Sequence, residues 1–346
     1  MTRPDLTVMG GGIFGLSIAW EAARRGARVR LIERERIGAG SSGGVVGALA
    51  PHVPENWNEK KAFQFDSLLM AQDFWQGVSL AADLPTGYAR RGRLQPIDTA
   101  EAAARASDRG REAETLWQGH ARWQVVPATG AAWEPQSPTG LLIHDTLSAR
   151  LHPRMAASAL VAAIGATGGE VVIGAAETVG PVIWATGHAG LTALNDDLGR
   201  KVGAGVKGQA LLLGCDAGNL PQMQVDGLHI VPHADGTVAI GSTSENHWDD
   251  PTSVDAQCDA LLTRAIAAVP FLQDAKVLDR WAGIRPRARS RAPMLGAWPG
   301  RDSAYIANGG FKIGFGMAPK VAQVMVDLVL DGVDQIPEGF RVEASL

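Results

Sequence analysis

The chain has 346 residues, 46% of them hydrophobic and 20% charged, a composition typical of a soluble globular protein with a large core. A formal net charge of −4 argues against a nucleic-acid-binding protein, and two cysteines are too few for a disulfide framework. No run of about 18 apolar residues predicts a membrane span, and three consecutive glycines interrupt the first apolar run. We therefore expect a cytoplasmic protein without a signal peptide.

The first predicted elements form a β-α-β unit. A short apolar strand over residues 6–9 leads into the glycine-rich turn of residues 10–15 and a helix over residues 16–25. A second strand, residues 27–32, alternates in polarity and is followed directly by Glu33. This order of strand, glycine turn, helix and strand is typical of a Rossmann-like dinucleotide-binding domain.

The turn fits the pattern G-x-G-x-x-G, and each glycine has a physical task. Gly10 permits a tight turn, Gly12 lets the backbone approach a pyrophosphate, and Gly15 lets the helix pack closely on the strand. Glu33 follows at the customary spacing of about 20 residues, where a carboxylate accepts hydrogen bonds from a ribose and disfavours the extra phosphate of NADP. The candidate cofactor residues here are Gly10, Gly12, Ile13, Phe14, Gly15, Glu33 and Arg34.

A second loop of small residues, 38–47, comes soon after Glu33. It is either a flexible linker or a site of close approach for an extended FAD, whose pyrophosphate and ring would be met by glycine backbone and serine hydroxyls. A nicotinamide dehydrogenase needs no such loop, so we favour FAD. The candidate residues in and after the loop are Gly40, Ser41, Ser42, Val46, Gly47, Ala48 and Leu49.

The later elements alternate between helices and short strands. Helices are predicted over residues 58–84, 100–118, 153–164, 254–269 and 318–330, and Pro153 suits the first turn of its helix. Strands are predicted over residues 94–97, 141–143, 170–173, 182–187, 210–213, 228–231, 237–241 and 304–307. The chain is expected to return through residues 277–278 and 281–284 to the cofactor domain.

Eight sequence blocks resemble the family of FAD-dependent D-amino-acid oxidases, and within it the glycine/sarcosine oxidase branch. They begin with GGGIFGLSIAWEAARRGARVRLIERERIGAGSSGGVVGALAP and continue with RRGRLQPI, HPRM, VIWATGHAG, GVKGQALLL, IVPHADGTVAIGSTSE, WAGIRPRARSRAPMLG and NGGFKIGFGMAPKVA. The resemblance implies an α/β fold in which a Rossmann-like, glutathione-reductase-type FAD-binding domain is interleaved with an antiparallel-sheet substrate domain. It places residues 1–75, 141–203 and 281–346 in the FAD-binding domain and residues 76–140 and 204–280 in the substrate domain.

The resemblance also implies further contacts to a non-covalently bound FAD. Val171 or Val172 would hold the adenine through its backbone, with Val172 taken as the candidate. The histidine that carries a covalent flavin in some relatives would fall near Gly44, which has no side chain. The other implied cofactor residues are Ala185, Thr186, Gly187, Gln209, Gly283, Arg285, Gly310, Phe311, Lys312, Ile313 and Gly314.

Three residues are candidates for handling the substrate. Arg285 is implied to hold a substrate carboxylate, since a guanidinium offers two parallel donors. His229 stands where relatives often have a tyrosine and either contacts substrate or is structural, whereas Lys312 replaces the arginine usual in this branch. No metal site is expected, because no His/Cys/Asp/Glu group shows ligand spacing.

Three arginines on alternate residues, Arg287, Arg289 and Arg291, depart from the family pattern. In a strand they would share one face. They form either a solvated basic edge or a reader for a second acidic group on the substrate.

The expected function is oxidation of an amino acid or secondary amine by FAD, with oxygen or another electron acceptor as second substrate. Two alternatives remain open at this point. One is a tRNA-modifying oxidoreductase domain that removes a carboxymethyl group from a modified uridine, against which the acidic net charge argues. The other is a non-catalytic FAD-binding subunit of an amine dehydrogenase complex.

Overall fold

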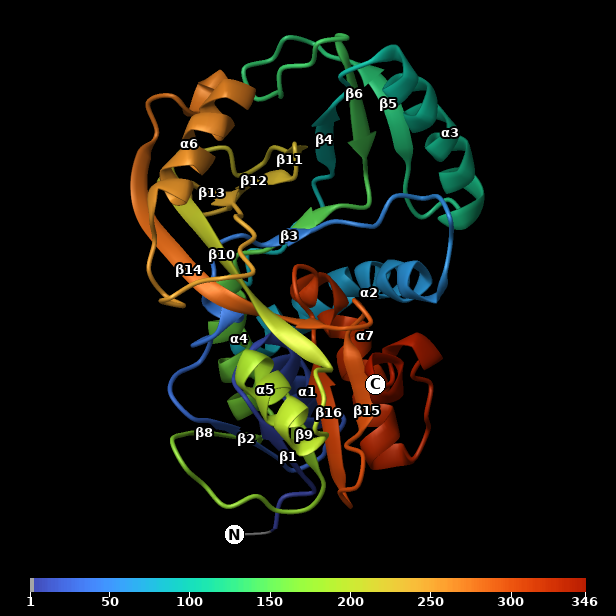
Figure 1. Cartoon of the computed structure of the whole chain (residues 1–346), viewed down its shortest axis with the longest axis vertical. Coiled ribbons are helices and arrows are strands. Elements are labelled where there is room, and N and C mark those ends of the chain that lie inside the picture. The colour runs from blue at the N-terminus through green and yellow to red at the C-terminus, as the bar shows by residue number, and fades with distance from the viewer. Residues whose placement is uncertain (1–2) are drawn as a thin grey trace.

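The computed structural model describes residues 3–346, and two large β-sheets dominate it, one below the other in Figure 1. The lower sheet has six strands, and all neighbours in it are parallel except the antiparallel pair at one edge. In spatial order the strands are β15 (Met294–Ala297), β16 (Ala304–Asn308), β9 (Val182–Trp184), β1 (Leu6–Met9), β2 (Val29–Glu33) and β8 (Glu170–Ile173). The central strand β1 is almost wholly buried, as the near-continuous apolar strands of parallel sheets usually are.

The upper sheet has eight strands and is antiparallel apart from the pair β11/β4. Its order is β14 (Lys276–Ala288), β10 (Gly203–Gly214), β13 (Thr237–Gly241), β12 (Leu228–Pro232), β11 (Gln222–Val225), β4 (Arg93–Pro96), β6 (Leu141–Asp145) and β5 (Trp123–Pro127). A small two-stranded sheet pairs β3 (Ala48–Leu49) with β7 (Ala149–Arg150). The parallel lower sheet and the antiparallel upper one confirm the predicted α/β class with a Rossmann-like part and an antiparallel part.

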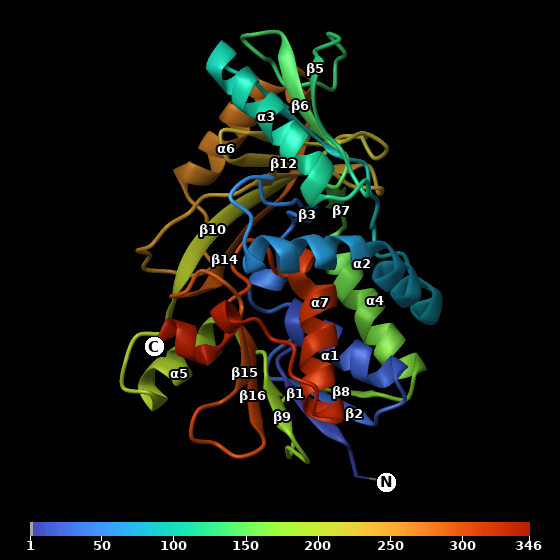
Figure 2. The same ribbon diagram turned by 90° about the vertical axis from the view of Figure 1, so that its right-hand side faces the viewer.

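Helices cover these sheets in layers. Figure 2 shows α1 (Ile13–Arg24), α4 (Pro153–Ala166) and α7 (Gly314–Val326) beside the lower sheet, with α2 (Glu59–Ala82) lying across their upper ends. The remaining helices pack elsewhere: α5 (Gly187–Asp197) on β10 and β14, α6 (Ala256–Ala268) on β10, β12 and β13, and α3 (Ala100–Leu116) on β5.

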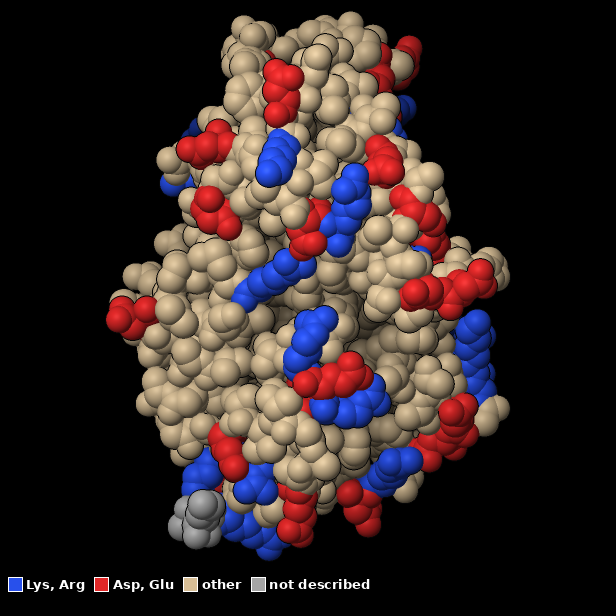
Figure 3. Space-filling model, turned by 90° about the vertical axis from the view of Figure 1, so that its left-hand side faces the viewer, with Lys and Arg blue, Asp and Glu red and all other residues tan. Residues whose placement is uncertain are grey.

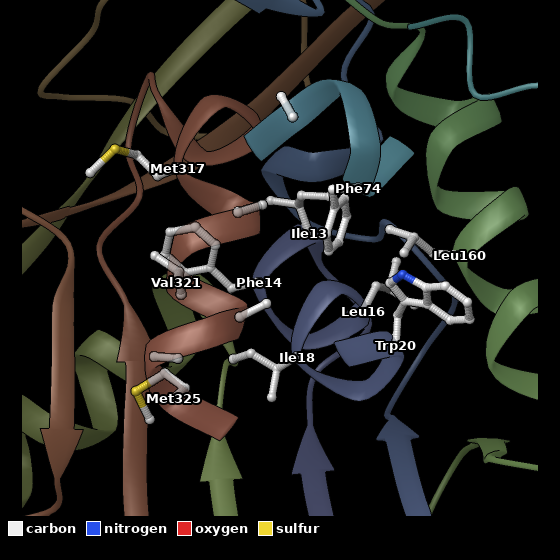
Figure 4. Packing of buried hydrophobic residues seen from close by; sticks show 14 of the residues in the cluster. Ile13, Phe14, Leu16, Ile18, Trp20, Phe74, Leu160, Met317, Val321 and Met325 are labelled. Atoms are coloured by element: carbon white, nitrogen blue, oxygen red, sulfur yellow. The ribbon is translucent and has the colours of Figure 1, made fainter. Parts of the chain in front are cut away.

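The helix after the glycine turn, α1, is the centre of the lower core. Figure 4 shows part of this core, with Phe14 and Ile18 of α1 facing Met317, Val321 and Met325 of α7. All residues of α1 from Ile13 to Ala23 are buried, so the helix has no solvent-facing stripe. The glycine turn is thereby attached to a rigid element.

Glu21 is a carboxylate inside this buried helix. Only 1% of the residue is exposed, and its two oxygens accept hydrogen bonds from Nε of Arg24 and of Arg25. These partners satisfy the charge within the core, since a buried unpaired carboxylate would be costly.

The structure differs from the predicted elements at several points. The last helix begins at Gly314 instead of residue 318 and passes into a π-helical turn after Val326, because packing of Met317–Val326 on α1 and α2 outweighs the low helix propensity of two glycines. Residues 277–278 and 281–284, through which the chain was expected to return, belong to one long strand, β14, which pairs along its length with β10. The helix α5, which begins at Gly187 shortly after β9, was not predicted.

The predicted domain boundaries stay predictions. The six-stranded sheet draws its strands from the three segments assigned to FAD binding. However, β6 begins at Leu141 and pairs with β4 and β5 in the upper sheet, and β14 runs through residue 281 without interruption. The chain therefore passes between the sheets without a break in secondary structure at these two points.

Within residues 3–346, no helix combines the length and the apolar composition needed to cross a bilayer. Acidic and basic side chains are interspersed on the face shown in Figure 3, with no extended single-sign area on that face. Cys215 and Cys258 are both free thiols.

Candidate active site

One cavity of about 1210 Å³ lies between the two sheets. It begins at the carboxyl ends of the parallel strands, where Met9, Glu33 and Trp184 line it, and it extends to the upper-sheet strand β14 at Gly283 and Arg285. The crevice outside the carboxyl ends of parallel strands is where ligands bind in open α/β folds.

Most sequence-predicted site residues line this cavity. They are Gly10, Gly12, Ile13, Phe14, Glu33, Arg34, Gly40, Ser41, Ser42, Val46, Ala48, Ala185, Thr186, Gly187, His229, Gly283, Arg285, Gly310, Phe311, Lys312, Ile313 and Gly314. Five others have different surroundings: Gly15, Gly47, Leu49, Val172 and Gln209. Chain segments up to about 300 residues apart in sequence therefore meet around one space.

The glycine turn has the geometry that its sequence predicts. Gly10 has φ = +109°, which a residue with a side chain adopts only under strain. A Cβ on Gly15 would lie 1.9 Å from the carbonyl oxygen of Gly10, so only glycine permits this contact between helix and turn. Gly15 thus shapes the turn from behind and does not itself line the cavity.

The start of α1 is held by the second glycine loop. Gly12 caps the helix and has no side chain to occupy its N-terminal end, and the backbone N–H of Ile13 donates to Oγ of Ser42 at 2.9 Å. The loop is therefore fastened to the nucleotide turn. The N-terminal end of α1 carries a partial positive charge suited to phosphates.

Glu33 is fixed at the end of β2 by two backbone donors. The N–H of Gly11 donates to Oε2 at 2.6 Å, and the N–H of Glu35 donates to Oε1 at 2.8 Å. Each carboxylate oxygen keeps lone pairs for a further donor. The position is the one expected for a ribose-binding carboxylate.

Arg285 lies at the opposite end of the cavity on β14 and is 7% exposed. Its Nη2 donates to the carbonyl oxygens of Lys207 (3.1 Å) and Thr243 (2.6 Å), and its Nη1 donates to Oγ of Ser242 (2.6 Å). Burial lowers the pKa of Arg285 to about 10, which still leaves it positively charged at neutral pH. The cavity therefore ends on a held guanidinium.

The Phe311 ring lies close to this guanidinium and to a second cation, Lys312. The Arg285 guanidinium carbon is 5.4 Å from the centre of the Phe311 ring, and Nζ of Lys312 is 5.7 Å from the same ring. Phe311 has φ = +44°, an unusual backbone conformation for a bulky residue. Burial, with the charge of Arg285, lowers the pKa of Lys312.

Polar side chains from β4, β11 and β12 line the same part of the cavity. Arg93 is paired with the buried carboxylate of Asp145 at 2.9 Å and donates to Oε1 of Gln224 at 2.8 Å. His229 lies beside them, and burial together with the charges of Arg93 and Lys312 lowers its pKa to about 4. At neutral pH His229 is therefore uncharged, and its buried Nδ1 meets no partner within residues 3–346.

The prediction that Arg287, Arg289 and Arg291 share one strand face is wrong. β14 ends at Ala288, and Arg291 has φ = +61°, so the alternation stops after Arg287. Arg287 contacts Asn246 and the outer side of Phe311, Arg289 donates to the carbonyl of Leu346, and none of the three lines the cavity.

Among the residues at the Arg285 end of the cavity that the sequence did not single out are Ser242 and Trp281. Ser242 lines the cavity beside Arg285, and the Trp281 ring would lie 3.3 Å from a Cβ on Gly44. Both stand within the blocks IGSTSE and WAGIRP, so a polar or aromatic residue inside a family block was the available signal.

His233 holds the loop next to Val46 from outside the cavity. It is fully buried, its Nε2 is 3.0 Å from the carbonyl oxygen of Val45, and its ring is 4.7 Å from that of His152. Since a carbonyl only accepts, Nε2 carries the proton. Burial and the neighbouring His152 lower the pKa of His233 to about 4.

Because the pKa of His233 is lowered in the folded protein, we expect the free energy of unfolding to fall in acid. The unfolded chain takes up a proton near the ordinary pKa of 6.5 and the folded chain only near 4, so the contribution is complete above pH 6.5 and is lost as the pH falls toward 4. We expect about 3 kcal/mol of the unfolding free energy to disappear across this window. Urea unfolding at several pH values measures it.

The control compares two variants. His233→Gln should reduce the pH dependence of the unfolding free energy between pH 6.5 and 4, to which His229 also contributes, whereas His247→Gln, at an exposed position, should leave the slope as in the unmodified protein. An unchanged slope in His233→Gln would refute the assignment.

The residues around the cavity fit an extended flavin dinucleotide. Glycine backbone forms its wall at Gly12, Gly44 and Gly310, where a Cβ would lie within 3.3 Å of Ser42, Trp281 and Phe14 respectively. The helix α7 starts at the cavity with Gly314 and Phe315, and its uncapped N-terminus brings a partial positive charge to the end that would hold the ring. Neither cysteine lines the cavity.

The chain is similar to several known proteins along nearly its whole length. The glycine oxidase of Pseudomonas aeruginosa is 27% identical over 354 residues, covering 94% of each chain. The crystal structure of glycine oxidase from Geobacillus kaustophilus superposes with a TM-score of 0.83 at 22% identity and covers 99% of both chains. That of iminodiacetate oxidase from Chelativorans sp. gives 0.84 at 19% identity, covering 97% of this chain and 98% of that one.

The sequence model of one family, DAO, described as FAD dependent oxidoreductase, matches residues 5–328. This span contains the glycine turn, Glu33, Arg285 and α7, which together enclose the cavity. The chain belongs to the DAO family of FAD-dependent oxidoreductases.

Proposed function

We propose that this enzyme oxidises an amino acid or a secondary amine that carries a carboxylate. The observation that carries the proposal is the charge pattern of the cavity. Within residues 3–346 the lining carboxylates are Glu33 and Glu35, which lie at the nucleotide end together with Arg34. Arg285 and Lys312 lie at the other end, where Arg93 is already paired with Asp145. An anionic substrate group is therefore attracted to the Arg285 end.

FAD, held by the glycine turn and Glu33, would supply a two-electron acceptor for the oxidation of the substrate amine to an imine. The chain's residues bind and orient the substrate. The guanidinium of Arg285 fixes the carboxylate, which limits the positions open to the α carbon and lowers the entropy cost of reaching a reactive geometry. The half-buried side chains of Phe311 and Trp281 line the cavity and narrow the space open to water.

His229 contributes as a neutral group. Its low pKa leaves the imidazole without charge at neutral pH, so it can accept a hydrogen bond from a substrate N–H without repelling a substrate cation. The similarity to glycine oxidases and to iminodiacetate oxidase supports small carboxylated amines as the substrate class.

The test is anaerobic mixing of the purified FAD-containing protein with glycine, N-methylglycine, D-amino acids, acidic amino acids and carboxymethyl amines. We expect loss of the oxidised flavin absorbance band with at least one carboxylated amine and none with the matching amines that lack the carboxylate. Equal bleaching by both kinds of amine would contradict the role of Arg285. No reduction by any small amine would favour a modified-uridine substrate or a subunit role, which gel filtration beside a steady-state assay would then separate.

Lys312 is the candidate to bind a second anionic group on the substrate. Its ammonium lines the cavity, and within residues 3–346 no hydrogen-bonding or ion-pair partner reaches it, whereas Arg93 already has Asp145. We propose that Lys312 attracts a second carboxylate, the task that the sequence suggested for Arg287, Arg289 or Arg291.

We expect Lys312→Met to raise KM for N-carboxymethylglycine about tenfold more than KM for N-methylglycine, because only the first substrate carries a second carboxylate. Steady-state assays with the two substrates measure the ratio. Lys201→Met, at an exposed position outside the cavity, is the matched control and should change neither value. Equal rises of both KM values would assign Lys312 to the flavin or to the common carboxylate instead.

A further inference from the structure

The hydrogen bonds of Arg285 leave few donors for a substrate. A guanidinium has five N–H groups. Both hydrogens of Nη2 go to the backbone carbonyls of Lys207 and Thr243, and one hydrogen of Nη1 goes to Ser242. Nε has no acceptor, but it is buried and sealed from the cavity space. One N–H on Nη1 remains.

With one free N–H, Arg285 alone does not donate to both oxygens of a substrate carboxylate. A fork uses either Nη1 with Nη2 or Nε with Nη2, and Nη2 is spent in both cases. Freeing Nη2 would break its 2.6 Å bond to the carbonyl of Thr243, which no backbone N–H within residues 3–346 replaces, whereas the carbonyl of Lys207 also accepts from the N–H of Glu245.

Ser242 has the missing donor. Its residue lines the cavity directly after β13, and its Oγ accepts from Nη1 of Arg285 at 2.6 Å. Within residues 3–346 no acceptor lies within hydrogen-bonding distance of this hydroxyl, so its own proton is free. The remaining Nη1 hydrogen and the serine proton therefore stand next to each other at the same end of the cavity.

We propose that Ser242 is a substrate-binding residue whose hydroxyl, together with Nη1 of Arg285, holds the substrate carboxylate. One carboxylate oxygen takes the Nη1 hydrogen and the other takes the hydroxyl hydrogen. The hydrogen bond that Oγ of Ser242 accepts from Nη1 of Arg285 polarises the hydroxyl and makes it a better donor. This inference rests on the proposed function, since it presumes a carboxylate at Arg285.

Binding of acetate to the FAD-containing enzyme tests it without turnover. Acetate offers a carboxylate and no amine, and its dissociation constant is read from the change in the flavin absorbance spectrum. We expect Ser242→Ala to weaken acetate binding at least about tenfold, the loss of one hydrogen bond to a charged group. Ser242→Thr keeps a hydroxyl and should restore most of the affinity.

The matched control is Ser244→Ala, two residues further on at an exposed position outside the cavity, which should bind acetate as the unmodified enzyme does. A merely structural role of Ser242 would lower the affinity in the alanine variant through displacement of Arg285. A crystal structure of the acetate complex separates the two, because direct binding places an acetate oxygen within hydrogen-bond distance of Oγ.

Each result decides the matter. Acetate seated on Nη1 and Nη2 of Arg285, with Ser242 turned away, overturns the inference, and so does unchanged affinity in Ser242→Ala while the unmodified enzyme binds acetate and oxidises carboxylated amines. An unmodified enzyme that binds no carboxylate overturns this inference together with the proposed function.

Discussion

Replacing Arg285 by methionine is expected to raise KM for carboxylated amines more than about 100-fold, with the bound FAD retained. The guanidinium is buried at the end of the cavity, and in such surroundings a charge-assisted hydrogen bond is stronger than in water. The 100-fold figure corresponds to about 3 kcal/mol of lost binding free energy. Methionine keeps a similar length and removes the charge.

The measurement is the concentration dependence of anaerobic flavin reduction by the best substrate of the panel. Arg287→Met is a matched control on the same strand, two residues away and outside the cavity, and should alter KM less than about threefold. Similar losses in the two variants would show that positive charge around Phe311 matters in general and that Arg285 makes no specific bond.

The second large effect is expected for Gly15→Ala, which should yield a protein that is destabilised by more than about 3 kcal/mol or that no longer retains FAD. The new Cβ would lie 1.9 Å from the carbonyl oxygen of Gly10. Both groups belong to rigid backbone, so no side-chain rotation relieves the overlap. The turn must open, and the turn is what would meet the pyrophosphate.

The control is the same substitution in another helix. Gly165 lies in α4, and a Cβ there meets no atom within 4 Å, so Gly165→Ala should stabilise the protein by about 0.5–1 kcal/mol through helix propensity. Urea unfolding and the ratio of flavin to protein absorbance measure both variants. A yellow Gly15→Ala protein of ordinary stability would show that the turn tolerates displacement.

The parts of the fold that were predictable are those with a local cause. Helix α2 follows from apolar spacing over its length, and Asn58 caps it by accepting from the N–H of Lys61. Helix α4 was expected from Pro153 at its first turn.

Other elements depended on partners remote in sequence. Strand β14 continues through Trp281 because β10 offers hydrogen bonds over its whole length. Helix α7 includes Gly314 and Gly316 because α1 and α2 provide an apolar surface for its other residues. Neither cause is visible in a window of neighbouring residues, where the glycines argue against regular structure.

Residues 6–33 are enough to predict the glycine turn from the sequence, because its strand, glycines, helix and terminal carboxylate lie within one short segment. The catalytic end has no such segment. Ser242 meets Arg285 across 43 residues and Val45 meets His233 across 188, through the pairing of β10 with β13 and β14 and the approach of the second glycine loop. Side-chain donors are distributed only after backbone pairing has chosen their neighbours, which is why the number of free hydrogens on Arg285 could be counted in the folded molecule alone.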